Sequence, residues 1–328
     1  AEFYAKRIVE YSIERQVKRV ADQAIQNKDQ RLGTELLDWL VSELRGVARR
    51  VADSGREFRS ALAAFFEHYD AEAEDRARNP YAVIGANAGL TSLDLALGGL
   101  RPGTLTVVSA QTKLGKTAFA VQAALANASR GKRVLLFSLE MPYVQIVERV
   151  IAIQALVPLE SITMRRMDLI EYGRATDLGN RDIRLLVMDT PGLHLSQIRA
   201  AAECAMCVEP LSLVVVDYLQ IVEHAGSKAM ARHEQVTAIT KGLKDLAKLL
   251  GVPVLTLAQV NEMGDPRESK GILHNADTEI LIQRDMTQYV DRQPAQLLIR
   301  YNRQGPRRQI QVYWEGRFVR FVDVETKR

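Results

Sequence analysis

Two patterns of apolar residues divide the chain near residue 80. In residues 1–79 the apolar positions recur every three or four residues, which predicts helices. A turn at 27–33 separates the first two apolar stripes and so predicts a helical hairpin. A third stripe comprises Phe58, Leu62, Phe65, Phe66 and Tyr69. A highly charged stretch follows it and ends at Pro80, which disfavours helix at the preceding residue and indicates a linker.

From about residue 83, apolar runs of strand length alternate with helical stretches. Four of the runs are nearly unbroken Val, Ile and Leu, which is typical of a parallel sheet covered by helices on both faces. The predicted strands are 105–110, 133–139, 183–189, 211–219 and 253–259. Shorter, more alternating runs predict an antiparallel extension made of 280–284, 296–301, 309–314 and 318–322. We therefore predict an α/β fold with a mainly parallel central sheet, an antiparallel C-terminal extension and an all-helical N-terminal segment.

Composition narrows the class of protein without deciding its function. Hydrophobic residues make up 47% and charged residues 26% of the 328 residues, so the chain should be globular. No apolar run reaches the ~18 residues of a membrane span, and no signal peptide opens the chain, so we expect no membrane partner and a cytoplasmic location. The net charge of +4 permits a polyanionic partner but does not require one. Cys204 and Cys207 form at most half a zinc site, and we interpret them as small apolar residues of a reduced protein.

The clearest chemical signal follows the strand 105–110. There the segment 110–117 precedes a good helix-forming stretch, which is the strand, turn and helix of a phosphate-binding loop. Gly115 lets the backbone turn its amides toward phosphate oxygens, Lys116 supplies a positive charge, and the Thr117 hydroxyl can ligate Mg²⁺. Ala110 stands where such loops usually begin with glycine. A chance Gly-Lys-Thr in a surface turn is the alternative, and it does not explain the flanking strand and helix.

Three polar residues end other predicted strands. Asp217 ends a buried apolar run, where an ionised carboxylate is costly unless it meets a cation, so we predict that it holds Mg²⁺ through water. Glu140 could polarise the attacking water, and Gln259 could hydrogen-bond the γ-phosphate. The alternatives are an Asp that caps the next loop and helix-cap or loop roles for Glu140 and Gln259.

With these residues placed, the chain resembles the bacterial and phage replicative helicases of the DnaB family from about residue 85 to 323. The segments that carry the resemblance are GLTSLDLALGGLRPG (89–103), the phosphate-binding loop, FSLEMP (137–142), DTPGLHLSQIR (189–199), VVVDYLQIV (214–222), LAQVNE (257–262), PRESKG (266–271) and NRQGP (302–306). Residues 4–20 resemble more weakly the helical hairpin that ends the family's N-terminal domain.

The resemblance implies a RecA-like motor that assembles as a hexameric ring, binds ATP and Mg²⁺ between subunits and threads single-stranded DNA. It also implies a primase partner, fused or separate, and a loader, in a bacterial cell or phage-infected host. The catalytic residues that it implies are Lys116, Glu140 as the catalytic glutamate, Gln259 as the sensor and Arg303 as the arginine finger. The ATP-binding residues are Gln111, Thr112, Lys113, Leu114, Gly115, Lys116, Thr117 and Arg149, and the metal residues are Thr117 and Asp217. We expect Arg267, Glu268 and Lys270 to bind DNA, with a solvated charged turn as the alternative.

We accordingly expect a helical hairpin over 1–55, a linker helix and linker over 56–84, and a RecA-like ATPase and helicase domain over 85–328. Because residues 1–9 read as the middle of a helix, we expect an upstream domain to precede them. Several positions depart from the family. Tyr301 replaces a common Lys, so either Arg300 supplies that charge or the finger works with less help. The stretch 261–265 is shorter than usual, Lys270 replaces Gly and Asn275 replaces an acidic residue.

The leading functional hypothesis is an ATP-dependent replicative DNA helicase. The alternatives are a RecA-like recombination ATPase and a loader that uses ATP as a switch and acts through partner proteins.

Overall fold

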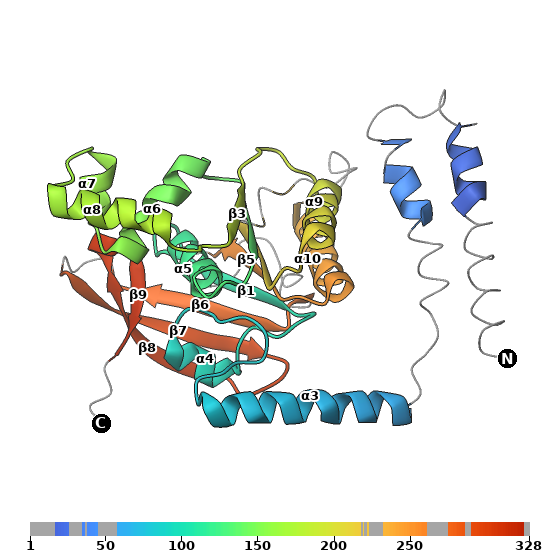
Figure 1. Cartoon of the computed structure of the whole chain (residues 1–328), viewed down its shortest axis with the longest axis horizontal. Coiled ribbons are helices and arrows are strands. Elements are labelled where there is room, and N and C mark those ends of the chain that lie inside the picture. The colour runs from blue at the N-terminus through green and yellow to red at the C-terminus, as the bar shows by residue number, and fades with distance from the viewer. Residues whose placement is uncertain are drawn as a thin grey trace. The chain divides into compact units, whose positions relative to one another are not determined.

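The computed structural model describes residues 17–25, 35–36, 38–44, 58–217, 219, 222, 232–260, 275–285 and 290–324. It divides into two compact units, Ala1–Glu74 and Asp75–Arg328 (Figure 1). In the first unit, residues 17–25 and 38–44 are helical, as the apolar stripes predict, and the turn at 27–33 lies outside the described residues.

Helix α3 (Phe58–Arg78) includes the charged stretch that the sequence indicated as linker. That stretch is rich in Ala, Glu and Arg, which are strong helix formers, so its charges do not interrupt the helix. The helix ends at Arg78, immediately before Asn79 and Pro80, where proline disfavours helical backbone. The helix thus extends past the apolar stripe that predicted it.

The second unit is built on a sheet whose described strands follow the order β3-β2-β4-β5-β1-β6-β7-β8-β9. Their bounds are β1 (Leu105–Ala110), β2 (Val134–Ser138), β3 (Leu185–Met188), β4 (Leu213–Asp217), β5 (Val254–Gln259), β6 (Thr278–Arg284), β7 (Arg292–Asn302), β8 (Arg308–Glu315) and β9 (Arg320–Asp323). The helices are α4 (Thr91–Leu97), α5 (Lys116–Ala128), α6 (Tyr143–Ala155), α7 (Leu159–Thr163), α8 (Leu169–Asp177), α9 (Leu195–Val208) and α10 (Arg232–Leu250). Each predicted strand corresponds to an observed one, which confirms the α/β fold.

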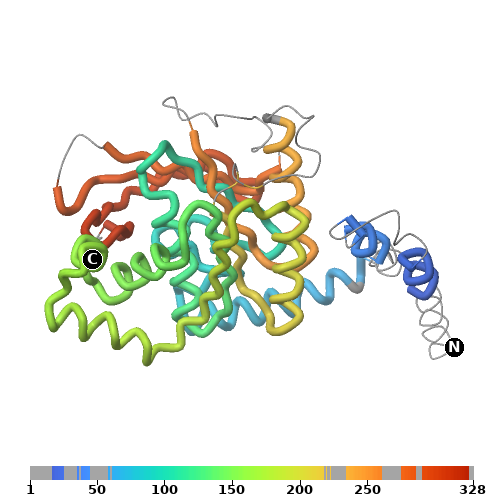
Figure 2. Tube along the Cα trace, turned by 90° about the horizontal axis from the view of Figure 1, so that it is seen from above, coloured from blue at the N-terminus to red at the C-terminus, as the bar shows by residue number. Residues whose placement is uncertain are grey.

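Helices cover the sheet on both faces. Buried side chains of α4, α5 and α6 pack on one face of the sheet. This packed face extends over the antiparallel strands β7, β8 and β9. Helices α9 and α10 lie side by side on the other face, as Figure 2 shows. The four central strands β1, β2, β4 and β5 are almost entirely buried, as the unbroken apolar runs require. Edge strand β3 is only half-buried.

One strand direction differs from the prediction. We expected 280–284 to begin the antiparallel extension, but β6 pairs parallel with β1 and antiparallel with β7. Residues 279–282 of β6 are all buried, as in a strand covered on both faces, and not alternately exposed. The antiparallel extension therefore begins with β7. The C-terminal strand also starts at Arg320 and not at Phe318, because Gly316–Phe318 forms a short 3-10 turn.

The strand directions place candidate functional residues at both ends of the parallel strands, along two opposite edges of the sheet. Strands β1 to β6 run parallel, so their carboxyl ends lie along one edge, where open α/β sheets bind ligands. Strand β7 runs the opposite way and ends at Asn302, paired with Thr278 at the amino end of β6. The hairpin after β7 therefore lies at the edge opposite the carboxyl ends.

In the part of the chain that is described, no helix is both long and apolar enough to span a bilayer.

Candidate nucleotide-binding site

The loop between β1 and α5 has the backbone shape of a phosphate cradle. Lys113 and Gly115 both adopt left-handed backbone conformations, with φ of 68° and 100°. A Cβ at Gly115 would lie 3.0 Å from the Trp314 ring and 3.1 Å from the Phe321 ring, so glycine is required for space as well as for conformation. Helix α5 begins at Lys116, directly after the turn, and its free N-terminal amides and dipole favour an anion there.

Lys116 points back over this loop. Its Nζ donates hydrogen bonds to the carbonyl oxygens of Ala110 and Gln111, each at 3.1 Å. Partial burial lowers the pKa of Lys116, while the neighbouring carboxylates Asp217 and Glu140 oppose that shift. The ammonium is thus held at the mouth of the cradle, where it can exchange these carbonyl contacts for phosphate oxygens.

Asp217 ends β4 at the same edge of the sheet and is only 2% exposed. Burial raises the pKa of this carboxyl to about 6, and a hydrogen bond with the Thr117 side chain opposes the shift. Among the described residues, its buried Oδ2 atom finds no hydrogen-bond partner. A buried carboxylate oxygen left open beside a threonine hydroxyl fits a hydrated cation. Within the same residues, no cluster of three or more His, Cys, Asp or Glu side chains is placed to hold a metal ion.

Glu140 and Arg149 lie beside Asp217. Glu140 is exposed and follows β2, whose Ser138 is in register with Asp217. The turn after β2 is fixed because the Ser138 hydroxyl donates to the Met141 carbonyl at 2.7 Å. Arg149 comes from α6, and burial lowers its pKa whereas Asp217, Glu148 and Glu140 raise it. The structure therefore brings the predicted carboxylates and cations of the ATP site together.

Gln259 reaches the loop from the neighbouring strand. It ends β5 in register with Ala110, and its Nε2 donates to the Thr112 hydroxyl at 2.6 Å. Gln259 therefore links the end of β5 to the phosphate loop. This contact fits a residue that responds to the bound nucleotide, although it involves the loop and not a phosphate.

Sequence reasoning missed Arg284. A cavity of about 450 Å³ adjoins the loop and is lined by residues of β6 and β7 together with Gln111 and Leu114. Arg284 lies at its wall, donates to the Lys113 carbonyl at 2.9 Å and stacks 4.6 Å from the centre of the Trp314 ring. The signal that could have found it is the one that found Gln259, a polar residue at the carboxyl end of an apolar strand.

Arg303 lies at the opposite edge of the sheet. It follows β7, and its backbone N–H donates to the Asp277 carbonyl at 2.8 Å. The predicted tight turn is present between β7 and β8. The chain's own phosphate loop and Arg303 thus lie at opposite ends of β1.

Arg300 forms a bulge in β7, where Tyr301 pairs with Glu279 and Ile299 with Ile280. Its guanidinium pairs with the buried Glu279 carboxylate (Nε to Oε2, 3.0 Å), while Arg303 pairs with Asp277. The two arginines therefore have separate carboxylate partners. The candidate DNA residues Arg267, Glu268 and Lys270 lie outside the described residues.

The fold and this site define an α/β domain with a phosphate-binding loop. Residues 85–323 match the family described as DnaB-like helicase C terminal domain, and the chain belongs to that family. Since the match covers most of the second unit, the site described above lies entirely within it.

Similar proteins agree with that membership. Replicative DNA helicase DnaB of Leifsonia xyli is 31% identical over 260 residues, which cover 74% of this chain and 57% of the relative. Replicative DNA helicase DnaB of Haemophilus influenzae is 34% identical over 273 residues, or 76% of this chain and 58% of the relative. Replicative DNA helicase DnaC of Bacillus subtilis is 28% identical over 349 residues, or 99% of this chain and 75% of the relative. The chain thus spans little more than half of the first two relatives.

Two solved structures share the fold. One is a DnaB-like replicative helicase described with its interactions with primase, and it has a TM-score of 0.79 and 23% identity. That match covers 99% of this chain and 79% of the other. The second is an ATPase domain with a TM-score of 0.74 and 23% identity, and the match covers 83% of this chain and all of the other.

Proposed function

We propose that this chain is the motor part of a replicative DNA helicase, which hydrolyses ATP at the interfaces of a ring and moves along single-stranded DNA. The observation that carries the proposal is the arrangement at the carboxyl edge of the sheet. There Lys116 lies above a phosphate cradle, and Thr117 and the buried Asp217 lie beside it with an open carboxylate oxygen. Glu140 also lies near Lys116, and its side chain is exposed.

Each side chain has a chemical task in this proposal. Thr117 and Asp217 hold Mg²⁺, which neutralises phosphate charge when bound. Lys116 stabilises the charge that builds on the transferred phosphoryl group, and Glu140 orients and polarises the attacking water. The cavity beside the loop, with Arg284 at its wall, has room for the adenine base of the nucleotide. Arg149 balances the two carboxylates, and a neighbouring subunit contributes Arg303.

The raised pKa of Asp217 gives a test of the metal site. The unfolded chain ionises this carboxyl near 3.8 and the folded chain near 6. The contribution of this carboxyl to stability is therefore fully present below the lower pKa and falls as pH rises through this window, by about 3 kcal/mol at ~1.4 kcal/mol per pKa unit. We expect Asp217→Asn to raise Tm at pH 7.5 without nucleotide and to lose Mg²⁺-dependent hydrolysis. Thermal melts at pH 5 and 7.5 measure the first effect, and a variant less stable than wild type at pH 7.5 would contradict it.

The predicted DNA contacts remain part of the proposal. We expect the double variant Arg267→Ala, Lys270→Ala to bind single-stranded DNA more weakly, equally for all sequences, because phosphate contacts carry no base information. Its log–log salt dependence should become shallower by about 1.4, for two contacts at ~0.7 each. Lys241→Ala, Lys248→Ala is the matched control, since both lysines are exposed on α10 and the variant loses the same charge. Equal affinity in the two double variants supports a solvated loop instead.

Helix α3 offers an assembly surface. Its apolar stripe is exposed, with Phe58 79%, Phe65 56% and Phe66 51% accessible. Such a stripe favours a partner, and we propose that it docks on a neighbouring subunit. We expect Phe58→Glu with Phe66→Glu to shift the protein toward smaller oligomers in sedimentation velocity. Glu67→Gln on the same helix is the control, and an unchanged oligomer in the double variant would favour packing within one subunit.

A fork-unwinding assay with and without ATP tests the function as a whole. ATP-dependent strand separation supports the helicase. DNA-stimulated hydrolysis with no unwinding favours a recombination ATPase. ATP binding that changes only partner binding favours a loader that uses ATP as a switch. Because a solved helicase of the same fold interacts with primase, a primase is a useful addition to this assay.

A further inference from the structure

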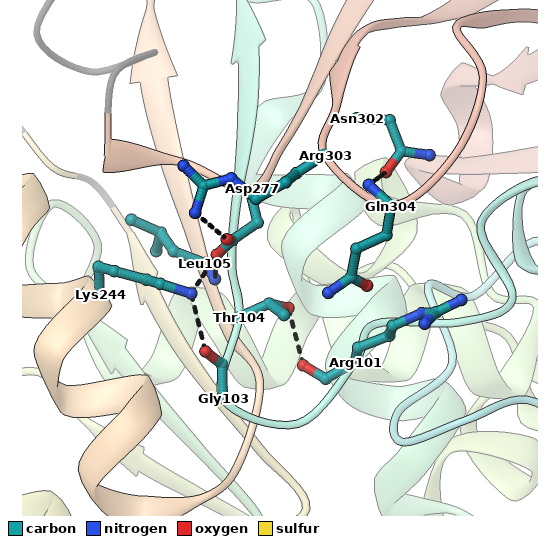
Figure 3. Close-up of polar contacts among 9 residues, drawn as sticks. All are labelled: Arg101, Gly103, Thr104, Leu105, Lys244, Asp277, Asn302, Arg303 and Gln304. Carbon is teal, nitrogen blue, oxygen red and sulfur yellow. Dashed lines mark hydrogen bonds and ion pairs between the residues drawn. The ribbon is translucent and has the colours of Figure 1, made fainter. Parts of the chain in front are cut away.

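A buried carboxylate lies at the base of the Arg303 hairpin. Asp277 precedes β6 and is 4% exposed. Its Oδ2 accepts hydrogen bonds from the Leu105 backbone N–H at 2.8 Å and from Lys244 Nζ of α10 at 2.5 Å. Its Oδ1 faces a terminal guanidinium nitrogen of Arg303 at 3.4 Å (Figure 3). One carboxylate thus joins the amino end of β1, helix α10 and the hairpin after β7.

The backbone of Arg303 is fixed by a hydrogen bond, whereas its side chain is largely exposed. The Arg303 backbone N–H donates to the Asp277 carbonyl. The Asp277 backbone N–H in turn donates to the Leu105 carbonyl at 2.9 Å. The Arg303 side chain is nevertheless 55% exposed. A hydrogen bond with the Tyr301 side chain, followed by the Asp277 charge, raises the pKa of the guanidinium. The Asp277 carboxylate therefore restrains the guanidinium while most of it stays accessible.

We propose that Asp277 is a positioning residue that orients the Arg303 guanidinium toward the ATP site of a neighbouring subunit. This inference rests on the proposed role of Arg303 in that site.

The charges around Asp277 favour a carboxylate that orients the Arg303 guanidinium without binding it tightly. Both Lys244 and Arg303 pair with Asp277, but Lys244 approaches it more closely and makes a further hydrogen bond to the Gly103 carbonyl at 2.9 Å. The carboxylate is therefore already neutralised by Lys244 and draws Arg303 only weakly. The remaining guanidinium nitrogens stay available for phosphate oxygens. A long arginine side chain loses much conformational freedom when it binds, so restraining it beforehand lowers the barrier of the step that it assists.

Two variants test the assignment in the assembled protein. Asp277→Asn keeps an acceptor for the Leu105 N–H but removes the charge, and Asp277→Glu keeps the charge but displaces it by one methylene. We expect kcat to fall about tenfold in Asp277→Asn and less in Asp277→Glu, within the ~10²-fold that a misplacement of 1 Å can cost. KM for ATP and the ring size should not change. Asp245→Asn, an exposed carboxylate next to Lys244 on α10, is the matched control.

Mixed rings separate a positioning role from damage to the fold. Asp277→Asn carries an intact phosphate loop, so mixing it with Lys116→Ala should restore activity, whereas mixing it with Arg303→Ala should not. The double variant Asp277→Asn, Arg303→Ala should be no slower than Arg303→Ala alone, because both changes act through one group.

Three results overturn the inference, and they differ from one another. Normal kcat in Asp277→Asn, with loss in Arg303→Ala, refutes positioning and leaves the proposed function intact. A higher kcat in Asp277→Asn shows that the carboxylate restrains Arg303 from acting. Full activity in Arg303→Ala refutes the arginine's role in the proposed function itself. If Asp277→Asn does not fold, as circular dichroism reports, Asp277→Glu decides alone.

Discussion

Lys116→Ala should abolish ATP hydrolysis. The lysine charge is matched to charge that develops on the phosphate oxygens during transfer, inside a site where water does not screen it fully. Removing one such preorganised group costs at least ~10²–10³ in kcat in comparable sites. The structure adds a reason, since Lys116 Nζ is already held over the loop by the Ala110 and Gln111 carbonyls and needs little rearrangement to reach a phosphate.

Steady-state phosphate release measures this effect, and Lys132→Ala provides a control at an exposed lysine of the same domain. Glu140→Gln provides the contrast. It should still bind ATP and assemble, because the amide keeps the shape of the side chain, but it should not turn over, because it cannot polarise water. Near-normal turnover in Lys116→Ala would remove the phosphate-loop assignment. Loss of nucleotide binding in Glu140→Gln would make Glu140 a structural residue.

The sequence predicted the elements of this fold better than their connections. Strands such as β4 were found because a strand buried on both faces must be apolar throughout. The direction of β6 was not found, because it is set by pairing with β1, far earlier in the chain, and nothing in 280–284 encodes that partner. The bulge at Arg300 and its pairing with Glu279 also escaped prediction. Both depend on residues that are 21 positions apart and meet only in the folded sheet.

The candidate site divides in the same way. Lys116, Asp217 and Gln259 could be placed from sequence because each ends or follows an apolar strand, and parallel strands carry such residues to one edge. Their interactions could not, because the bond from Gln259 to Thr112 depends on the β1–β5 register. For Arg303 the residue was predicted but its restraints were not. Asp277 carries no motif, and only its burial beside Lys244 distinguishes it from other carboxylates.

Arg303→Ala should lose hydrolysis as fully as Lys116→Ala, but only because of what it removes from a neighbour. The sheet places Arg303 at the amino edge of the parallel strands, held by Asp277, and places the phosphate loop at the carboxyl edge. Strand β1 alone, with six residues at ~3.3 Å each, separates the two by about 20 Å. An arginine side chain does not span that distance, so Arg303 cannot serve its own subunit.

Mixing the two inactive variants tests this argument. An arginine supplied in trans is worth about 10³–10⁵ in rate in related phosphoryl transfer, so each variant alone should be nearly inactive. In mixed rings some interfaces pair an intact phosphate loop with an intact Arg303, and hydrolysis should partly return. With random mixing in equal amounts, roughly a quarter of interfaces are complete, which sets the recovery to expect if sites act independently. Doubly substituted subunits, mixed with wild type, give the matched control for dilution. If labelled subunits exchange and no activity returns, Arg303 does not act across the interface.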